Sequence, residues 1–417
     1  MNEIKVGFFL AIRQLKHASI WATILIVLVM VLTFLNLISV SGILVGLIEG
    51  INRGYIAEYT GDVFVTNHTN KAFIEQSQSL IKTIESLPEV KSYSARYKES
   101  GTIEAGFKEK IDQTDIPNRT GVTIVGIDPV KESETTKIAS LLIAGEYLDS
   151  DDTDYVVVGA DLLEKYSRFV GAGGDLIFFL KGADVGSEIR LTVNGVEKNV
   201  TIKGIIQSKV DQVTMRVYMN EEEFRKLAGR SDLNVDEIAI RLFDPAEADR
   251  IKRILIAAGG DKLGFIQTAK ETQPQFVQDM TKTFNLLGSA IGSIGLAVAS
   301  ITIFIVIFIN AISRRKYIGI MKGIGIHGSA IEISYIIQSL FYALAGTTVG
   351  VSLVYGILVP YFGKHPISFP FSDGVLVAPL GLTSFRVFLL LITTLVAGFI
   401  PAKLIIKKNT LDSILGR

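Results

Sequence analysis

Apolar residues are gathered into four long runs, one early in the chain and three toward its end. These runs cover residues 19–48, 284–312, 331–360 and 387–406. A helix needs about 20 residues to cross the hydrocarbon of a bilayer, so each run can span it. No charged residue lies at the centre of a run. The pattern predicts four transmembrane helices, with residues 19–54 forming the first helix and a stalk.

The polar stretch between the first two runs, residues 55–283, has the patterns of an aqueous α+β domain. Residues 55–121 and 233–283 are predicted to pack together as a membrane-proximal α+β lobe. This prediction depends on a strand–helix–strand order that occurs twice, at Asp62–Thr66, Ala72–Leu87 and Val90–Ala105, and again at Glu237–Phe243, Pro245–Ala258 and Leu263–Thr268. The expected fold is membrane α-helical, with a large two-lobed α+β extracytoplasmic domain inserted between the first and second helices.

The middle of that domain, residues 122–232, is predicted to be a β-rich distal lobe. Asn194-Gly195 between two apolar runs is typical of a tight hairpin. Short helices are expected at Asp161–Ser167 and Glu221–Ala228, and Lys108–Arg119 is expected to be an exposed loop. The predicted strands are Val122–Val125, Tyr155–Val158, Leu176–Leu180, Ile189–Val193, Val200–Ile206 and Val213–Tyr218.

Basic residues are distributed unevenly among the loops, and this distribution predicts the orientation. Loop 361–385 has only Lys364. Basic residues gather instead before the first run, between the second and third, and after the last: Lys5, Arg13, Lys16, Arg314, Arg315, Lys316, Lys322, Lys403, Lys407, Lys408 and Arg417. By the positive-inside rule both termini and the tail are cytoplasmic and the large domain is outside. The expected location is the cytoplasmic (inner) membrane, as a multi-pass protein.

Residues 1–18 have the pattern of an amphipathic helix lying on the cytoplasmic face of the membrane. The apolar residues that share one arc are Ile4, Phe8, Ala11, Ile12 and Leu15, with basic residues beside them. The alternative is that this segment is only the basic flank of the first span.

The composition agrees with a membrane protein that carries a large aqueous domain. Of the 417 residues, 48% are hydrophobic and 20% are charged, with a net formal charge of +0. The chain has no cysteine and four histidines, and it contains neither a phosphate-binding Gly-x-x-x-x-Gly-Lys-Ser/Thr loop nor a His-Glu-x-x-His zinc motif. We therefore expect no catalytic, cofactor-binding or metal residues and no enzyme activity in this chain. The net charge says nothing about nucleic acid, and the expected partners include none.

The segment that joins the second and third spans, residues 313–330, has an unusual pattern. It contains four basic residues and no acid, and its apolar residues alternate with glycines, which a solvated connector does not need. We interpret it as a docking element for a cytoplasmic partner, in which Ile318, Ile320 and Ile324 fill an apolar groove and Arg314, Arg315 and Lys322 meet acidic rims. The alternative is a topology signal alone.

Glycines spaced four residues apart occur in three of the predicted spans. This spacing of small residues lets helices approach closely. The predicted helix-packing positions are Gly42, Gly46, Gly288, Gly292, Gly346 and Gly350. The alternative is a chance enrichment of glycine in membrane helices.

The layout and the loop together resemble the FtsX-like permeases of the ABC transporter superfamily, of the MacB, LolC and LolE type. The family loop commonly reads Arg-x-x-Glu-Ile-Gly-Ile-Leu-(Arg/Lys)-Ala-Leu-Gly-Ala-Ser. Tyr317 replaces the usual Glu, Gly323 the Ala and His327 the small residue. The loop positions that match are Arg314, Ile318, Gly319, Ile320, Lys322 and Gly325, and further similar stretches are Ala144–Leu148 with Val156–Gly159, Pro401-Ala402 and Thr410–Leu415.

The resemblance implies that the loop is a coupling helix seated in a separate ATPase subunit, which would bind ATP and Mg²⁺. The coupling residues would be Arg314, Arg315, Lys316, Ile318, Gly319, Ile320, Lys322, Gly323, Ile324 and Gly325. It also implies a second permease copy, identical or homologous, and contact with membrane lipids. Further partners would be a periplasmic carrier, a lipoprotein or an outer-membrane component.

Two functions follow from the resemblance. The first is an ABC permease that transmits ATP-driven movement to its outer domain, for export or membrane extraction of lipoproteins, peptides or amphiphilic compounds. The second is an FtsX-like signalling subunit that activates an extracytoplasmic partner such as a cell-wall hydrolase. The copurified partner discriminates between them. A secondary transporter is not favoured, because such proteins usually have repeated helix bundles with broken helices at the midplane.

Overall fold

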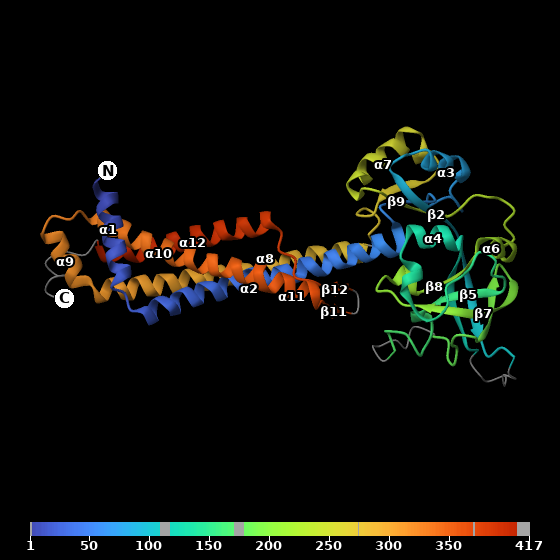
Figure 1. Ribbon diagram of the computed structural model, residues 1–417, viewed down its shortest axis with the longest axis horizontal. Coiled ribbons are helices and arrows are strands. Elements are labelled where there is room, and N and C mark those ends of the chain that lie inside the picture. The colour runs from blue at the N-terminus through green and yellow to red at the C-terminus, as the bar shows by residue number, and fades with distance from the viewer. Residues whose placement is uncertain (1, 109–116, 171–178, 274, 370–371, 407–417) are drawn as a thin grey trace. The chain divides into compact units, whose positions relative to one another are not determined.

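The computed structural model describes residues 2–108, 117–170, 179–273, 275–369 and 372–406 (Figure 1). These residues form two compact units. The helical unit comprises residues 1–48, 278–368 and 373–417, and the α+β unit comprises residues 49–277 and 369–372, in both cases as far as they are described. The boundary between the units falls inside the first long helix.

The helical unit contains helices long and apolar enough to cross a membrane, and these confirm the four predicted spans. Two short strands, β11 (Ile367–Phe369) and β12 (Ser372–Gly374), form a separate two-stranded sheet. The helices are α1 (Asn2–Lys16), α2 (Ile20–Tyr55), α8 (Gln275–Ser313), α9 (Arg315–Gly323), α10 (Gly328–Leu353), η7 (Val354–Leu358), α11 (Val359–Lys364) and α12 (Leu380–Ile406).

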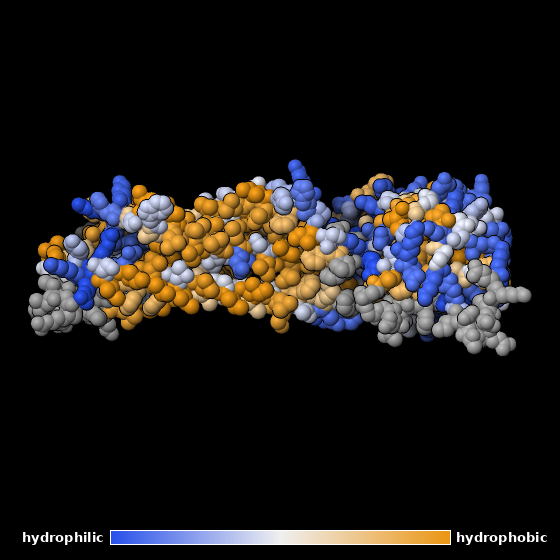
Figure 2. All heavy atoms as spheres, turned by 90° about the horizontal axis from the view of Figure 1, so that it is seen from below, coloured by the Kyte–Doolittle hydropathy of each residue, from blue (hydrophilic) through white to orange (hydrophobic). Residues whose placement is uncertain are grey.

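The interior of the helical unit is a single apolar cluster that α2, α8, α10 and α12 share. Met30 and Phe34 of α2, Ile303 of α8, and Tyr335 and Tyr342 of α10 are all at most 2% exposed. The outer face of the same helices is also apolar, as the orange surface in Figure 2 shows. A bundle that is apolar both inside and outside needs a hydrocarbon surround, because water would otherwise meet its exposed Leu, Ile and Phe side chains.

The α+β unit begins with η1 (Ile56–Thr60), a π-helix that directly follows α2. Its remaining elements are β1 (Val63–Thr66), α3 (Ser77–Glu85), β2 (Val90–Ala105), β3 (Arg119–Ile127), α4 (Pro129–Thr135), η2 (Ile138–Leu141), β4 (Leu142–Gly145), β5 (Tyr155–Gly159), η3 (Ala160–Leu162), β6 (Glu188–Val193), β7 (Val196–Ile206), α5 (Asp211–Thr214), β8 (Arg216–Asn220), α6 (Glu221–Ala228), β9 (Glu237–Leu242), η5 (Pro245–Glu247), α7 (Ala248–Ala257), η6 (Gly260–Lys262) and β10 (Phe265–Thr268).

The first half of this unit is a split β-α-β arrangement. Its strands follow the order β10-β1-β9-β2, and every neighbouring pair is antiparallel. Each strand–helix–strand unit, β1-α3-β2 and β9-α7-β10, therefore leaves room between its own strands for one strand of the other. Apolar residues of α3 and α7, such as Leu80, Ile84 and Leu255, lie in the same core as the strand residues Val63 and Val65.

The second half of the unit continues the sheet through β2. Residues 90–96 of β2 pair with β9, and residues 97–104 pair with β3. The order then runs β3-β8-β5-β7-β4, with β6 pairing both β2 and β7. The hairpin predicted at Asn194-Gly195 is confirmed, since both residues have positive φ, 50° and 80°, as a type I′ turn requires.

Several element predictions were wrong in detail. The helix expected from Ala72 begins only at Ser77, because the Ile74 amide donates to the Val235 carbonyl at 2.9 Å and holds this stretch outside the helix. The helix expected at Asp161–Ser167 is absent from the described structure beyond the three residues of η3. There Asp161 is fully buried and binds Arg168, which fixes an irregular turn.

Further differences concern strands. The strand expected from Val213 begins at Arg216, because α5 takes the residues before it. Helix α4 and strand β4 were not predicted. Residues 176–178 of the strand expected at Leu176–Leu180, residues 109–116 of the loop Lys108–Arg119, and Thr410–Leu415 lie outside the described residues.

Candidate functional site

The loop between α8 and α10 contains a short helix, α9, with a defined end. Gly325 has φ +91°, a conformation that favours glycine. Its amide donates to Lys322 O at 3.1 Å, and the Ile326 amide donates to Met321 O at 3.0 Å. This pair of hydrogen bonds is a Schellman motif, which satisfies the last carbonyls of α9 and turns the chain toward α10. Gly325, one glycine of the loop pattern, therefore serves to end α9.

The two faces of α9 have different surroundings. Ile318 is 2% exposed and belongs to the core of the helical unit, and Gly319 is also buried. Tyr317, Ile320 and Ile324 are 67%, 44% and 73% exposed. The prediction that Ile318 fills a partner's groove was wrong, because its own chain already buries it. We call the exposed set Arg315, Lys316, Tyr317, Ile320 and Ile324 the α9 face.

Lys322 does not point outward as predicted. Its Nζ donates to the carbonyl of Ile406 at 2.8 Å, which ties α9 to the end of α12. The other end of the loop is tied to α1, where Glu3 accepts a hydrogen bond from Ser329 and lies 3.4 Å from Nδ1 of His327. These ties hold the two ends of the loop to α12 and α1 of the same unit.

The predicted glycine positions have two kinds of neighbour. A Cβ on Gly346 would meet Met30 at 2.4 Å, and one on Gly350 would meet Phe34 at 2.4 Å, so α10 packs closely on α2 there. Gly288 and Gly292 lie against α2 less tightly, with the nearest side-chain atoms at 3.5 Å and 3.1 Å.

Gly42 and Gly46 contact an extended segment instead of a helix. A Cβ on Gly46 would lie 1.7 Å from Val375 O, and one on Gly42 would lie 2.9 Å from Val377 O. The expectation of helix–helix packing was wrong here, because the backbone before α12 occupies the groove. The remaining glycine of the loop pattern, Gly323, has open space around it.

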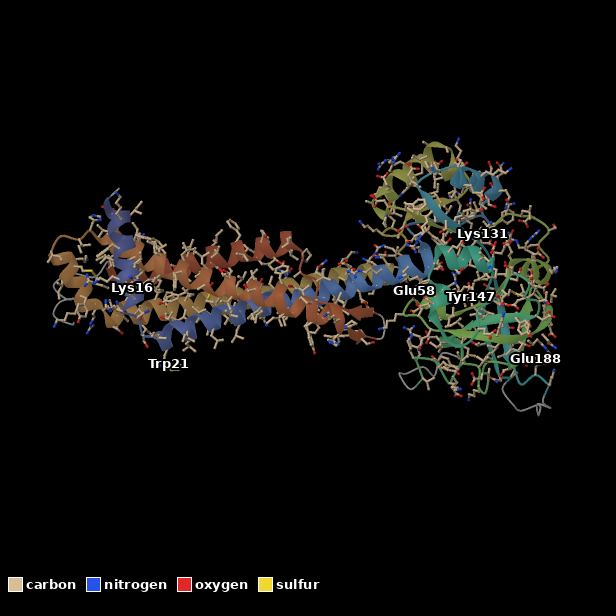
Figure 3. All side chains as sticks on the ribbon, viewed as in Figure 1. Lys16, Trp21, Glu58, Lys131, Tyr147 and Glu188 are labelled. Carbon is tan, nitrogen blue, oxygen red and sulfur yellow. The ribbon has the colours of Figure 1, made fainter. Side chains whose placement is uncertain are left out.

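A second candidate site lies in the α+β unit, where η1 is fixed by both halves of the sheet. The Ile56 carbonyl accepts from Arg241 Nη2 at 2.7 Å, and the Ala57 carbonyl accepts from the Lys137 amide at 2.8 Å. We call Ile56–Thr60, the groups that bind it and the two adjoining buried ion pairs, Arg216 with Glu237 and Arg96 with Glu132, the η1 anchor. Two further ties join Ser208 to Glu58, the latter labelled in Figure 3, and Tyr55 to Gln212.

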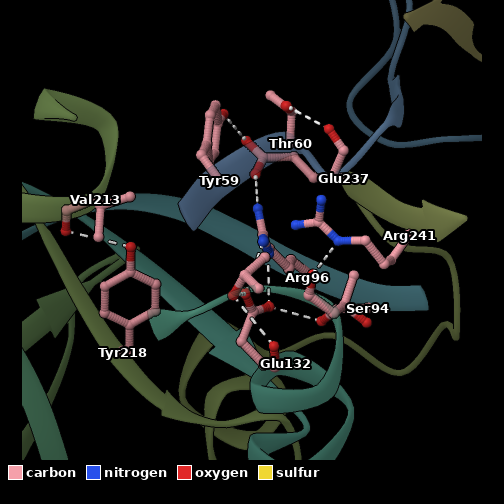
Figure 4. A network of polar contacts seen from close by, with 12 residues as sticks. Tyr59, Thr60, Ser94, Arg96, Glu132, Val213, Tyr218, Glu237 and Arg241 are labelled. Atoms are coloured by element: carbon pink, nitrogen blue, oxygen red, sulfur yellow. Dashed lines mark hydrogen bonds and ion pairs between the residues drawn. The ribbon is translucent and has the colours of Figure 1, made fainter. Parts of the chain in front are cut away.

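Tyr59 connects η1 to a buried ion pair (Figure 4). Its hydroxyl donates to Glu237 Oε1 at 3.2 Å and accepts from Arg216 Nη2 at 3.0 Å. Arg216 also binds both oxygens of Glu237, each at 3.0 Å, and their side chains are 9% and 1% exposed. Lys98 Nζ donates to the same carboxylate at 3.0 Å.

A second buried pair, Arg96 with Glu132, adjoins the first. Arg96 Nε and Nη2 each donate to Glu132 at 2.7 Å, and the two side chains are 2% and 0% exposed. Arg96 Nη1 also lies 3.6 Å from Glu237 Oε2. The hydroxyls of Ser94 and Thr136 donate to Glu132 at 2.7 Å and 2.6 Å. Each carboxylate therefore has several donors.

Charge governs the protonation of these carboxylates. Burial alone would raise the pKa of Glu237, but the charges of Arg216 and Lys98 outweigh burial and hold the pKa far below its usual range. Burial also opposes ionisation of Glu132, and Arg96 reverses that effect and lowers its pKa. The neighbouring Asp236 behaves differently, since burial raises its pKa to about 6.

The η1 anchor thus joins β2, α4, β8 and β9 through two buried ion pairs, and the Tyr59 hydroxyl joins η1 to them. Removing one partner of such a network leaves a buried charge uncompensated, so the arrangement resists displacement of η1 within the unit. Within the described residues, no group of three or more His, Cys, Asp or Glu side chains is arranged to hold a metal ion.

The sequence contained only a partial signal for this network. Arg216 stands between Met215 and Val217 at the start of an apolar strand, and Glu237 opens the apolar strand β9. Charges within apolar strands indicate a buried ion pair. Their pairing could not be predicted, because it depends on which strands lie side by side.

Comparison with known proteins decides the family of the helical part. Residues 289–410, which include α9, match the FtsX-like permease C-terminal family. This region belongs to the FtsX-like permease family. The resemblance inferred from the loop is thereby confirmed, and two glycines of the similar outer stretch, Gly145 and Gly159, prove to be sites where an added Cβ would lie 2.1 Å and 2.0 Å from backbone oxygens.

The chain is also similar to ABC transporter permeases. The macrolide export ATP-binding/permease protein MacB of Agrobacterium fabrum is 24% identical over 186 residues, 43% of this chain and 28% of that protein. An uncharacterised ABC transporter permease protein of Mycobacterium tuberculosis is 26% identical over 183 residues, 42% of this chain and 20% of that protein. The chain thus covers less than a third of the length of these relatives.

Among solved structures, the periplasmic region of MacB from Actinobacillus actinomycetemcomitans matches with a TM-score of 0.34 and 14% identity, over 51% of this chain and 91% of that one.

Proposed function

We propose that this chain is the membrane subunit of an ABC transporter, which transmits ATP-driven movement from a separate ATPase subunit to an extracytoplasmic α+β domain. Its work is the export or membrane extraction of lipoproteins, peptides or amphiphilic compounds. The observation that carries the proposal is the α9 face, which presents exposed apolar and basic side chains on a loop between two membrane helices of an FtsX-like domain.

The proposed contact differs from the set that the family pattern implies. Ile320, Ile324 and Tyr317 would enter a groove of the ATPase, with Arg315 and Lys316 meeting its acidic rim. Ile318, Gly319 and Lys322 would instead hold α9 to the helical unit, since they are buried or bound within it. Tyr317, where the family has Glu, would make an apolar contact in place of a charged one.

Orientation and assembly belong to the same proposal. In this proposal both termini and α9 are cytoplasmic and the α+β unit is outside. The basic residues before α2, between α8 and α10 and in α12 support that orientation. Helix α8 has the smallest buried share of the four spans, 22% of its most apolar window. We infer that α8 packs against a second permease copy in the membrane.

The proposal is tested by measuring whether the permease changes the rate of ATP hydrolysis by the ATPase. The full chain is co-expressed with the ATPase subunits of its own cell, and the ATPase that copurifies is assayed with and without the permease. Ile320→Ser with Ile324→Ser should remove the permease-dependent change in ATP hydrolysis and weaken copurification. The matched control is Ile143→Ser with Val196→Ser, which alters two exposed apolar residues of the α+β unit and should leave coupling intact.

Full coupling by the α9 double variant would refute the proposed contact. ATP hydrolysis by the permease alone would refute the assignment of that activity to a separate ATPase subunit. Copurification of a cell-wall hydrolase in place of a carrier or cargo would favour the signalling alternative.

A further inference from the structure

A pocket of about 430 Å³ lies inside the helical unit, between α1, α9 and α10. Helix α1 packs against α10 closely, since a Cβ on Gly7 would meet Ile333 at 2.7 Å. The Gln338 amide also donates to Gln14 at 2.5 Å. The pocket is therefore an open recess between helices that contact one another. Its lining residues are Leu10, Arg13, Gln14, His17, Arg314, Tyr317, Ile318, Met321 and Tyr335.

The charge of this pocket is entirely positive among the residues that line it. The charged lining residues are Arg13 of α1 and Arg314, the N-cap residue of α9. His17, which directly follows α1, also lines the pocket. Within the described residues, neither arginine forms an ion pair. The acidic residues of the surrounding helices, Glu3 and Glu332, do not line the pocket. Such a concentration of cations favours an anionic ligand.

A buried hydroxyl adds a second, independent indication of a ligand. Tyr335 lines the pocket and is 1% exposed, yet its hydroxyl has no hydrogen-bond partner among the described residues. Buried polar groups are seldom left unpaired, because each unpaired group costs free energy of desolvation.

The lining also includes aliphatic side chains, and the surface beside it is apolar. Leu10, Ile318 and Met321 line the same pocket as the cations. The neighbouring surface of α1 exposes Ile4, Phe8 and Phe9. Trp21, at the start of α2, is 82% exposed, and Figure 3 marks it and Lys16 at this end of the unit. Exposed tryptophan beside basic residues is typical of the level of lipid headgroups.

We propose that this pocket binds the phosphate group of an anionic phospholipid. Arg13 and Arg314 would hold the phosphate oxygens through their planar guanidinium groups, and the Tyr335 hydroxyl would donate a further hydrogen bond. The acyl chains would leave along the apolar surface of α1. The bound lipid would join α1 to the start of α9, and the proposal is independent of any ATPase.

The experiment measures lipid binding to the purified full chain by native mass spectrometry. The probes are palmitoyl-oleoyl phosphatidylglycerol, phosphatidylcholine with the same chains, and inorganic phosphate as competitor. One phosphatidylglycerol should bind per chain, about tenfold or more tighter than phosphatidylcholine. Arg13→Gln with Arg314→Gln should lower that affinity by about tenfold or more.

A matched control separates the pocket from general surface charge. Lys5→Gln with Lys316→Gln removes the same charge from the same two helices outside the pocket and should change the affinity by less than about twofold. Tyr335→Phe, which keeps the packing of the ring, should weaken binding by about three- to tenfold.

Three results would overturn the proposal. The first is equal affinity for the two lipids. The second is an equal loss in the control variant. The third is displacement of phosphatidylglycerol by millimolar inorganic phosphate, which would show a site for free phosphate.

Discussion

The α9 face and the η1 anchor use charge in opposite ways. In the α9 face, basic side chains are exposed beside exposed Tyr317, Ile320 and Ile324. In the η1 anchor, Arg96, Arg216 and both carboxylates are buried and bind one another. Exposed charge of one sign leaves a surface ready for a partner, whereas buried charge of both signs fixes neighbouring elements in one geometry.

This contrast separates residues whose substitution changes a binding surface from residues whose substitution destabilises the fold. A substitution in the α9 face alters a surface, and its cost to the fold is small. A substitution in the η1 anchor alters a balance of buried charges, and the fold bears the cost. The comparison therefore predicts that stability and coupling respond to different residues.

The largest loss of stability in the η1 anchor is expected at acidic pH. Glu132 and Glu237 have lowered pKa values, so they stabilise the fold above the ordinary glutamate value of 4.5, and this stability is lost as the pH falls below it. Asp236 has the opposite sign, because its pKa is raised to about 6 and its protonation favours the folded state as the pH falls toward that value.

The α+β unit should therefore become slightly more stable between pH 7 and about 5 and then much less stable below pH 4.5, as measured by thermal unfolding of the full chain in detergent. Asp236→Asn should abolish the rise and keep the fall. A monotonic loss from neutral pH in the unmodified chain would show that Asp236 is not shifted as inferred.

The second largest loss of stability is expected when one carboxylate of the η1 anchor is removed. Glu237→Gln leaves Arg216 buried without its partner and should lower the unfolding free energy by about 3–5 kcal/mol, measured by denaturant unfolding. The double variant Arg216→Met with Glu237→Leu removes both charges and should recover most of that loss. If the single variant costs less than about 1 kcal/mol, the pair is more hydrated than its burial indicates.

The smallest effect is expected in a matched pair on α9. Ile318→Ala should lower stability by about 2–4 kcal/mol, because it opens a cavity in the helical core. Ile324→Ala, six residues later and 73% exposed, should change stability by less than about 0.5 kcal/mol. Thermal unfolding of the two variants checks this difference, and equal losses would show that both faces of α9 are buried in the protein under test.

The hydrophobic pattern predicted the architecture better than it predicted the sites. Runs of apolar residues identify spans regardless of what packs on them, and alternating strands such as Val200–Ile206 were recognised for the same reason. The Asn194-Gly195 hairpin depends on local turn chemistry alone, and it too was predicted correctly.

Features that depend on contacts between residues far apart in sequence were predicted wrongly or were not predicted. Ile318 and Ile320 are both apolar in the loop, and only packing shows that one is buried and the other is not. Gly46 has the spacing of a helix-packing residue but contacts an extended segment. The partners of Arg216, Tyr59 and Glu237, come from a helix and a strand that are far apart in sequence, so no local pattern could reveal them.

Strand β2 has a consequence for anyone who dissects the α+β unit. Its first residues pair with β9 and its later residues with β3 and β6. Excising residues 122–232 would strip residues 97–105 of their neighbours and leave a long open edge, which invites other chains to pair with it. The two halves should therefore be produced together, because a truncated fragment would tend to precipitate even if its remaining core were sound.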